Sequence, residues 1–303
     1  MKLLKALGIG KSPVRRLRRA GSPVVVVREP SDGNGLFFHF NGNLGWMRWA
    51  EEHGYRCYID MQTPRNIFHR DRDIDFNPWD CFFRQDCTAL DVAEARVAFT
   101  NAQVKSPPLF PRLGRNDISN QDDAEFRGWR EFVRRHIALS DRVKALVEDR
   151  YAALFGGTDN VLGCFVRGTD YTKLRPSRHL VQPTPEQVIS DARKIGAERH
   201  VDRIFLATED REVKAMFTRA FGDRLICSQS ELPDYHGTES LARDGALGDA
   251  ARTLEIQMQY LVSMVLLSRC RHFLAGVASG SIGAALLSRG FETMRFYDLG
   301  FYP

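Results

Sequence analysis

Three short polar segments in the second half of the chain each follow an apolar run typical of a buried strand. They are Arg167-Gly168-Thr169-Asp170, Thr208-Glu209-Asp210, and Gly276 to Ser281. In an open parallel sheet, ligands bind beyond the carboxyl ends of the strands. We therefore expect the three segments to lie on one rim and to form one binding site.

The residue types on this rim fit a pyrophosphate group. A guanidinium such as that of Arg167 binds two phosphate oxygens at once and keeps its charge at physiological pH. The third segment opens a predicted helix, and the unsatisfied amides at a helix start attract anions. The sequence therefore predicts catalytic roles for Arg167 and Asp170 without a metal. The residues predicted to complete this pyrophosphate site are Thr208, Glu209, Asp210, Ser279, Gly280 and Ser281.

Each segment also has an ordinary structural explanation. Arg167 alone could form a surface salt bridge at a strand end, and the serine-rich segment could be a tight strand-to-helix turn. The spacing of Gly276, Gly280 and Gly283 is not the glycine pattern of dinucleotide-binding folds. The functional interpretation depends on three such segments occurring at matching strand ends.

A fourth polar segment lies in the first half, where residues 39–45 (HFNGNLG) are predicted to form a turn between a strand and a helix. Amide side chains and backbone N–H groups suit a polyhydroxylated ligand, although such turns are also chosen for positive φ angles. Four residues are expected to line the acceptor or donor-sugar side of a cleft: His39, Asn41, Asn43 and Asp60. Three carboxylates are candidates for a base that accepts the proton of a hydroxyl of such a ligand, and the sequence does not choose among Asp60, Asp170 and Glu209.

The second half alternates between apolar strands and helices, which predicts a parallel, doubly wound sheet with right-handed crossovers. The predicted strands are 161–166, 203–208, 224–227, 272–275 and 294–297. The predicted helices are 186–198, 211–221, 250–268 and 281–288.

The first half begins with the same alternation of strands and helices and then becomes less regular. Strands are predicted at 24–27, 36–40 and 56–60, and helices at 46–53, 122–136 and 141–155. The glycines and polar residues at 156–160 predict a hinge. We therefore predict an α/β fold of two Rossmann-like domains that face a central cleft. The predicted bounds are 1–20 for a basic tail, 21–157 for the acceptor-side domain and 158–303 for the domain with the pyrophosphate site.

The net charge of +5 originates in the first twenty residues. They hold seven lysines and arginines and no acidic residue, so the rest of the chain carries a net charge of −2. Such a segment, which also contains leucines and an isoleucine, could contact an anionic membrane surface or be a solvated terminus. Nucleic-acid binding has no support besides this tail, and we predict none.

The remaining composition indicates a chain without a membrane span. No apolar run approaches the roughly 20 residues that a span needs, and no signal-peptide stretch follows the basic residues. Six cysteines without a C-x-x-C pair predict reduced, mostly buried thiols, and hence a cytoplasmic protein, peripheral to the inner membrane face if the tail binds there. Asp71-x-Asp73-x-Asp75 resembles an acidic metal clip, but no clear strand precedes it, so we expect a solvated loop.

Together these segments resemble the motifs of the fucosyltransferase superfamily, which contains α-1,6-, α-1,2-, nodulation-factor and protein O-fucosyltransferases. Residues 166–171 (VRGTDY) are similar to its H-x-R-x-[GT]-D motif, and residues 204–210 (IFLATED) to its second motif, a strand followed by A-T-[DE]-[DE]. Residues 267–281 are similar to its third motif, which ends in a serine-rich turn, and residues 39–45 resemble its N-terminal Gly/Asn turn. The resemblance covers residues 161–290 and, less closely, 36–60.

This resemblance implies a GT-B arrangement in which residues 158–303 bind GDP-fucose or a similar nucleotide sugar. It implies an inverting, metal-independent transfer to a glycan hydroxyl, with Arg167 on the donor pyrophosphate. This class of glycosyltransferase indicates a role in surface polysaccharide biosynthesis. The alternative is a catalytically inactive module of the same fold that binds a nucleotide sugar or a glycan. Phe165 stands where the family often has a base-contacting histidine, and Ser263 and Met264 stand where it often has an acid.

Overall fold

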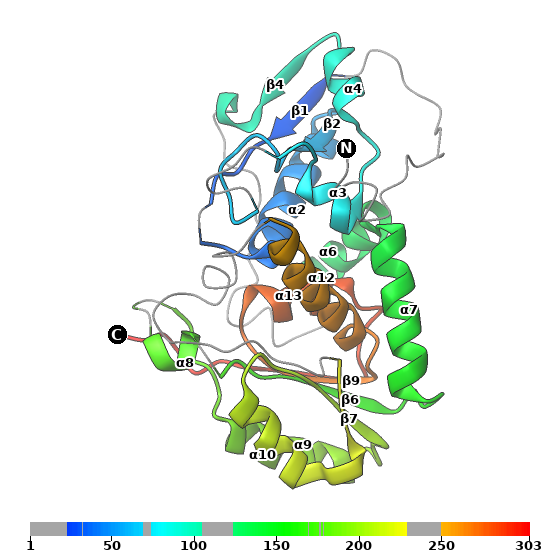
Figure 1. The fold of residues 1–303 in the computed structure, drawn as a ribbon, viewed down its shortest axis with the longest axis vertical. Coiled ribbons are helices and arrows are strands. Elements are labelled where there is room, and N and C mark those ends of the chain that lie inside the picture. The colour runs from blue at the N-terminus through cyan, green and yellow to red at the C-terminus, as the bar shows by residue number, and fades with distance from the viewer. Residues whose placement is uncertain are drawn as a thin grey trace.

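The computed structural model describes residues 23–31, 33–68, 74–104, 124–168, 170–175, 177, 179–228 and 250–303. Two parallel sheets lie towards opposite ends of the molecule, and a layer of helices lies between them (Figure 1). The N-terminal sheet has the strand order β2-β1-β4, and the C-terminal sheet has the order β10-β9-β6-β7-β8. The predicted pair of parallel α/β sheets is therefore confirmed.

The N-terminal sheet consists of β1 (Val24–Val27), β2 (Arg56–Ile59) and β4 (Ala98–Thr100). The four valines of β1 are all buried, as expected for a central strand covered on both faces. A separate antiparallel pair joins β3 (Phe83–Arg84) to β5 (Ala138–Leu139). The short helices α3 (Pro78–Phe82) and α4 (Ala89–Ala93) and a 3₁₀ turn (Asn101–Gln103) complete this part.

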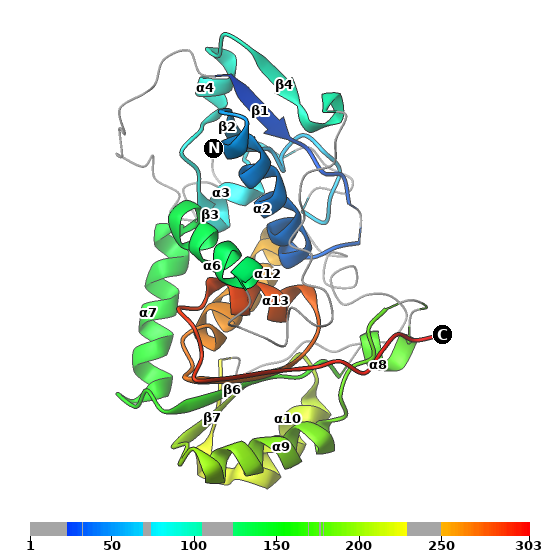
Figure 2. The same ribbon diagram turned by 180° about the vertical axis from the view of Figure 1, so that it is seen from behind.

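The C-terminal sheet follows the predicted alternation closely, and every predicted strand and helix of this half is found with ends within two residues. Its strands are β6 (Val161–Phe165), β7 (Arg203–Ala207), β8 (Leu225–Cys227), β9 (His272–Gly276) and β10 (Thr293–Tyr297). Helices α9 (Pro185–Glu198) and α10 (Arg211–Phe221) cover its outer face (Figure 2). The sequence did not predict the short helix α8 (Asp170–Leu174) or the 3₁₀ turn (Gly222–Arg224).

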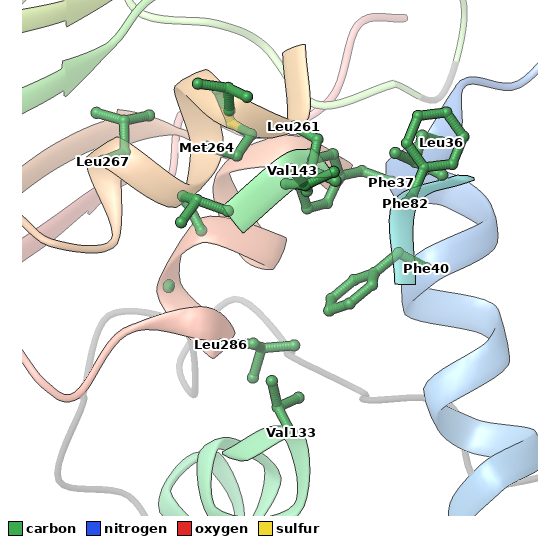
Figure 3. Close-up of a cluster of buried hydrophobic side chains, with 14 of the residues drawn as sticks. Leu36, Phe37, Phe40, Phe82, Val133, Val143, Leu261, Met264, Leu267 and Leu286 are labelled. Carbon is green, nitrogen blue, oxygen red and sulfur yellow. The ribbon is translucent and has the colours of Figure 1, made fainter. Parts of the chain in front are cut away.

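The helical layer joins the two sheets through one hydrophobic core. Its helices are α2 (Leu36–Glu52), α6 (Ala124–His136), α7 (Asp141–Phe155), α12 (Ala250–Leu267) and α13 (Ser279–Leu287). The buried cluster is continuous across the predicted domain boundary at residue 157, since it contains side chains from Val27 to Phe296. Figure 3 shows side chains of this cluster from three of these helices, Phe37 and Phe40 of α2, Leu261 of α12 and Leu286 of α13.

The predicted strand at 36–40 is wrong, because these residues form the first turns of α2. Leu36, Phe37, Phe40 and Leu44 are buried at helical spacing, which places them on one side of the helix. The predicted turn at 39–45 is therefore also wrong: the segment is helical, and its glycines do not have positive φ angles. By contrast, Gly156 ends α7 in the left-handed conformation with φ of 59°, within the predicted hinge.

Gly283 lies where α13 meets α2. A Cβ atom built on Gly283 would overlap the ring of Phe37, so only glycine lets the two helices approach this closely. Phe37 also makes an edge-to-face contact with Tyr260 of α12, with ring centroids 5.5 Å apart. The glycine is thus required by packing between the two halves of the chain.

We predict that Gly283→Ala lowers the free energy of unfolding by about 1–3 kcal/mol, the usual cost of overpacking a filled core. The matched control is Gly128→Ala in α6, where no atom lies within 4 Å of the added methyl group. That control should raise stability by about 1 kcal/mol through helix propensity. Urea unfolding followed by circular dichroism measures both, and equal stability of the two variants would contradict the packing argument.

Candidate functional site

The carboxyl ends of β6, β7 and β9 bring the three polar segments of the second half together. Phe165 of β6 lies opposite Ala207 of β7 and Ala275 of β9. Arg167 follows Phe165 by two residues, so it lies at the same edge of the sheet as the segments that continue β7 and β9. The predicted common rim is confirmed.

Arg167 is held in place by Glu209. Its Nε atom lies 3.0 Å from Oε1 of Glu209 in an ion pair whose side chains are only 12% and 11% exposed. The same carboxylate oxygen accepts a hydrogen bond of 3.2 Å from the amide of Gly168. A Cβ atom on Gly168 would lie 2.6 Å from Cβ of Asp210, so the close approach of the two segments needs a glycine. Glu209 thus fixes the position of the arginine.

Asp210 and Thr208 have local structural roles in this part of the site. Asp210 is buried, and its Oδ1 atom caps α10 by accepting hydrogen bonds from the amides of Glu212 at 2.7 Å and Val213 at 3.1 Å. The hydroxyl of Thr208 accepts a hydrogen bond from the amide of Asp210 at 3.2 Å. Asp170 is the first residue of α8, and its side chain lies outside what the structure describes.

Helix α13 begins at Ser279, two residues earlier than predicted, and its N-terminus has no side-chain cap. The N-cap residue is Ala278, which carries no acceptor. The amides of Ser279 and Gly280 in the first turn have no carbonyl partner within the helix. Ser281 is fully buried, and its hydroxyl contacts the carbonyl oxygens of Gly276 at 2.7 Å and Ala278 at 2.9 Å. Ser281 therefore shapes the turn, while the amides of Ser279 and Gly280 form the positive end of the helix dipole.

The first two turns of α2 meet this helix start from the other half of the chain. The Nδ2 atom of Asn41 donates a hydrogen bond of 3.1 Å to the carbonyl oxygen of Ser279. His39, Asn41 and Asn43 are each only 2% exposed. Oδ1 of Asn41 and Nε2 of His39 are buried and have no hydrogen-bond partner among the described residues. Buried polar atoms of this kind are normally satisfied by water or a ligand.

Asp60 follows β2 at the edge of the N-terminal sheet, where its carboxylate is fully engaged. Its oxygens accept hydrogen bonds from Arg28 Nε at 2.7 Å, the amides of Gln62 and Thr63, and the hydroxyl of Thr63 at 2.7 Å. Burial alone would raise the pKa of Asp60, but the hydrogen bonds from Thr63 and Arg28 outweigh it and lower that pKa. Asp60 is thus a structural anion and a weak proton acceptor.

Three residues near these segments were not predicted. Gln257 of α12 accepts a hydrogen bond of 2.9 Å from the amide of Leu36, at the start of α2. Tyr260 places its hydroxyl where a Cβ atom of Gly280 would be. Glu29 follows β1 and receives two hydrogen bonds on one oxygen. Only Glu29 had a signal in the sequence, its position two residues after an apolar strand.

Several other predictions concern residues that the structure does not describe. The basic tail at 1–20 lies outside the described residues, as do Asp71 and Asp73 of the acidic segment. Among the described residues, no group of His, Cys, Asp or Glu side chains could hold a metal ion. In the same part of the chain, no helix is long and apolar enough to cross a membrane. All six cysteines are free thiols, and four of them are buried.

Comparisons with known proteins reveal a clear structural similarity. No protein-family model and no curated protein sequence matches the chain. A solved structure of NodZ alpha-1,6-fucosyltransferase soaked with GDP-fucose is similar with a TM-score of 0.51 and 17% identity, over 88% of this chain and 93% of that one. The fold is that of a fucosyltransferase.

Two further structures have this fucosyltransferase fold. POFUT1 in complex with GDP-fucose matches with a TM-score of 0.51 and 9% identity, over 94% of this chain and 99% of that chain. Fucosyltransferase NodZ from Bradyrhizobium matches with a TM-score of 0.50 and 18% identity, over 88% and 94% of the two chains. The expected GT-B-like α/β fold is confirmed.

The buried His39 on this fucosyltransferase-like fold predicts a pH-dependent stability. Burial lowers the pKa of His39 to about 4, whereas the unfolded chain takes up the proton near pH 6.5. Between these values the unfolded state binds more protons, so stability falls as the pH falls. We expect the free energy of unfolding to drop by about 2 kcal/mol from pH 7 to pH 5 through this residue alone.

Urea unfolding at pH 7 and pH 5 measures this effect. The His39→Gln variant should lose that part of the pH dependence, while the exposed control His53→Gln should keep it. An unchanged drop in stability for His39→Gln would show that His39 is not the responsible group.

Proposed function

We propose that the protein is an inverting, metal-independent glycosyltransferase that transfers a sugar, fucose from GDP-fucose, to a glycan hydroxyl. The observation that carries this proposal is that Arg167 follows β6 and that the start of α13 follows the neighbouring strand β9. The structural similarity supports it, because NodZ and POFUT1 structures with this fold contain GDP-fucose.

In this proposal the donor pyrophosphate lies between Arg167 and the start of α13. Arg167 binds phosphate oxygens from the β6 side, and the amides of Ser279 and Gly280 bind them from the α13 side. These groups together neutralise the pyrophosphate without a metal ion.

These groups also explain how transfer would be accelerated. As the bond between the anomeric carbon and the β-phosphate oxygen breaks, negative charge grows on that oxygen. The guanidinium of Arg167 and the helix amides stand ready to stabilise this charge, and stabilisation of this kind contributes most of the rate enhancement in many enzymes. Glu209 keeps Arg167 oriented before the donor binds, so little side-chain freedom is lost at that step.

The remaining assignments complete the proposal. Thr208 and Asp170 border the donor on the same rim, and His39, Asn41 and Asn43 contact the sugar or the acceptor from α2. The acceptor is a glycan in surface polysaccharide synthesis on the cytoplasmic side, and residues 1–20 bind the protein to the anionic inner face of the membrane. Nucleic acid has no part in this function.

Replacement of Arg167 tests the proposed donor site. We expect Arg167→Ala to reduce turnover of GDP-fucose by about 10²–10³-fold, as for other preorganised donors to a developing oxyanion. Arg167→Lys should recover little, because an ammonium group lacks the bidentate fork. Arg193→Ala, at an exposed position on α9, is the matched control and should behave like the wild type. Full activity of Arg167→Ala would refute the proposal.

A nucleotide screen tests the identity of the donor. A ligand that binds only the native state raises its melting temperature, so GDP should stabilise the protein and UDP, ADP and CMP should not. Stabilisation by UDP alone would show that the donor carries uridine diphosphate and not GDP. Binding of GDP without any turnover of GDP-fucose would indicate a binding module that does not catalyse transfer.

A further inference from the structure

The turn that joins β9 to α13 carries the two amides that the proposed function places on the donor pyrophosphate. These amides, of Ser279 and Gly280, have no carbonyl partner within the helix. They stabilise a developing charge best if the turn already holds them in position, because preorganised donors need no rearrangement during the reaction. Ser281 fixes the turn from within through its hydroxyl. A second contact fixes the turn from a different segment of the chain.

That contact comes from Gln182, in the connection that leads from β6 through α8 to α9. Its Nε2 atom donates a hydrogen bond of 2.9 Å to the carbonyl oxygen of Val277, in the turn after β9. The same atom donates a hydrogen bond of 3.2 Å to the carbonyl oxygen of Leu180. Gln182 is only 4% exposed. A buried side chain from the β6 side of the rim therefore holds the turn on the β9 side.

The hydrogen bond from Gln182 fixes the peptide group that comes directly before the two amides. The carbonyl of Val277 and the amide of Ala278 belong to this one peptide group. The carbonyl accepts from Gln182, and the amide donates a hydrogen bond of 2.9 Å to Oγ of Ser281. The group is thus held at both of its polar ends, and the next amides along the chain are those of Ser279 and Gly280.

Close packing at Gly276 keeps the amide of Gln182 against the end of β9. A Cβ atom on Gly276 would lie 2.2 Å from Oε1 of Gln182 and 2.8 Å from Cδ of Pro183, so a side chain there would displace both. Oε1 is buried and has no hydrogen-bond partner among the described residues. An apolar side chain of similar size would avoid this unpaired oxygen, whose burial costs free energy. The hydrogen bond from Nε2 to the turn therefore explains why a glutamine stands here.

The backbone on both sides of Gln182 is anchored, so its side chain extends from a fixed point. On one side, the amide of Val181 donates a hydrogen bond of 2.9 Å to the carbonyl oxygen of Gly300, in the segment after β10. On the other side, Thr184 caps α9 with its side chain. Gln182 thus transmits the position of two neighbouring elements to the turn before α13.

We propose that Gln182 is a positioning residue for the transfer reaction, an inference that rests on the proposed glycosyltransferase function. Gln182 is buried and acts through the turn, without contact to the donor. It holds the peptide group of Val277 and Ala278, so that the amides of Ser279 and Gly280 are in place for the pyrophosphate before the donor binds. A misplacement of about 1 Å in such a site can cost about 100-fold in rate.

The test uses Gln182→Met in the full chain, which keeps a side chain of similar length and removes the hydrogen-bond donor. Without ligand, hydrogen–deuterium exchange at residues 278–280 should become about fivefold faster, the factor that one typical hydrogen bond contributes. Turnover of GDP-fucose, measured as GDP release with water as acceptor, should fall by about 10–100-fold. The Kd for GDP should rise by about fivefold, because the turn must be ordered again when the pyrophosphate binds.

Gln103→Met is the matched control, because it removes another hydrogen bond between a glutamine side chain and the main chain. Gln103 is exposed, and its Oε1 atom accepts a hydrogen bond of 2.7 Å from the amide of Thr100, at the end of β4. This strand belongs to the sheet at the opposite end of the molecule (Figure 1). The control should leave both the exchange at residues 278–280 and the turnover unchanged.

The outcomes separate this inference from the proposed function. Unchanged exchange at residues 278–280 in Gln182→Met, or faster exchange over the whole chain, would show that Gln182 does not hold this turn in particular. Wild-type turnover by a variant whose turn exchanges faster would overturn the role of Gln182 in transfer. Absence of GDP binding and turnover in the wild type would overturn the proposed function and, with it, this inference.

Discussion

The packing of α2 against α13 is the contact on which the rest of the structure depends. Gly283 lets the ring of Phe37 approach the second turn of α13, and Asn41 binds the carbonyl oxygen of Ser279. Because the two helices belong to different halves of the chain, this contact fixes the N-terminal sheet relative to the C-terminal sheet. It also places Asn41 against the start of α13, where amides without a carbonyl partner in the helix create positive potential. A phosphate-bearing ligand is the natural partner of that arrangement.

Several charged groups that follow the strands of the two sheets are organised before any ligand binds. Glu209 holds Arg167, Asp60 holds Arg28, and Asp210 caps α10. Each carboxylate lowers the cost of keeping a cation or a helix end in a partly buried position, because a buried charge needs a partner. These three carboxylates therefore position other groups of the structure.

The sequence predicted the C-terminal half well because strands and helices there differ clearly in length and period. Five apolar strands alternate with helices, and their ends were found within two residues. The prediction failed at residues 36–40 because a short aromatic run fits a buried strand and a buried helix equally well. The bonds and contacts that favour the helix, from Leu36 to Gln257 and from Phe37 to Gly283, involve residues more than 200 positions away. The local sequence pattern could not reveal these long-range contacts.

The sequence by itself therefore determined the order of the elements in the C-terminal half and the sheet edge at which Arg167, Glu209 and Ser279 follow their strands. Parallel strands separated by helices place every strand end on the same edge, whatever the details of packing. Only the tertiary structure decided which of these side chains are engaged in holding the fold. Asp60 accepts a hydrogen bond from Arg28, 32 residues away, and Glu29 accepts one from Asn101, 72 residues away. Asn41 donates a hydrogen bond to the carbonyl oxygen of Ser279, 238 residues away. A hydrogen bond needs its two atoms within about 3 Å, and for residues this far apart only the folded chain sets that distance.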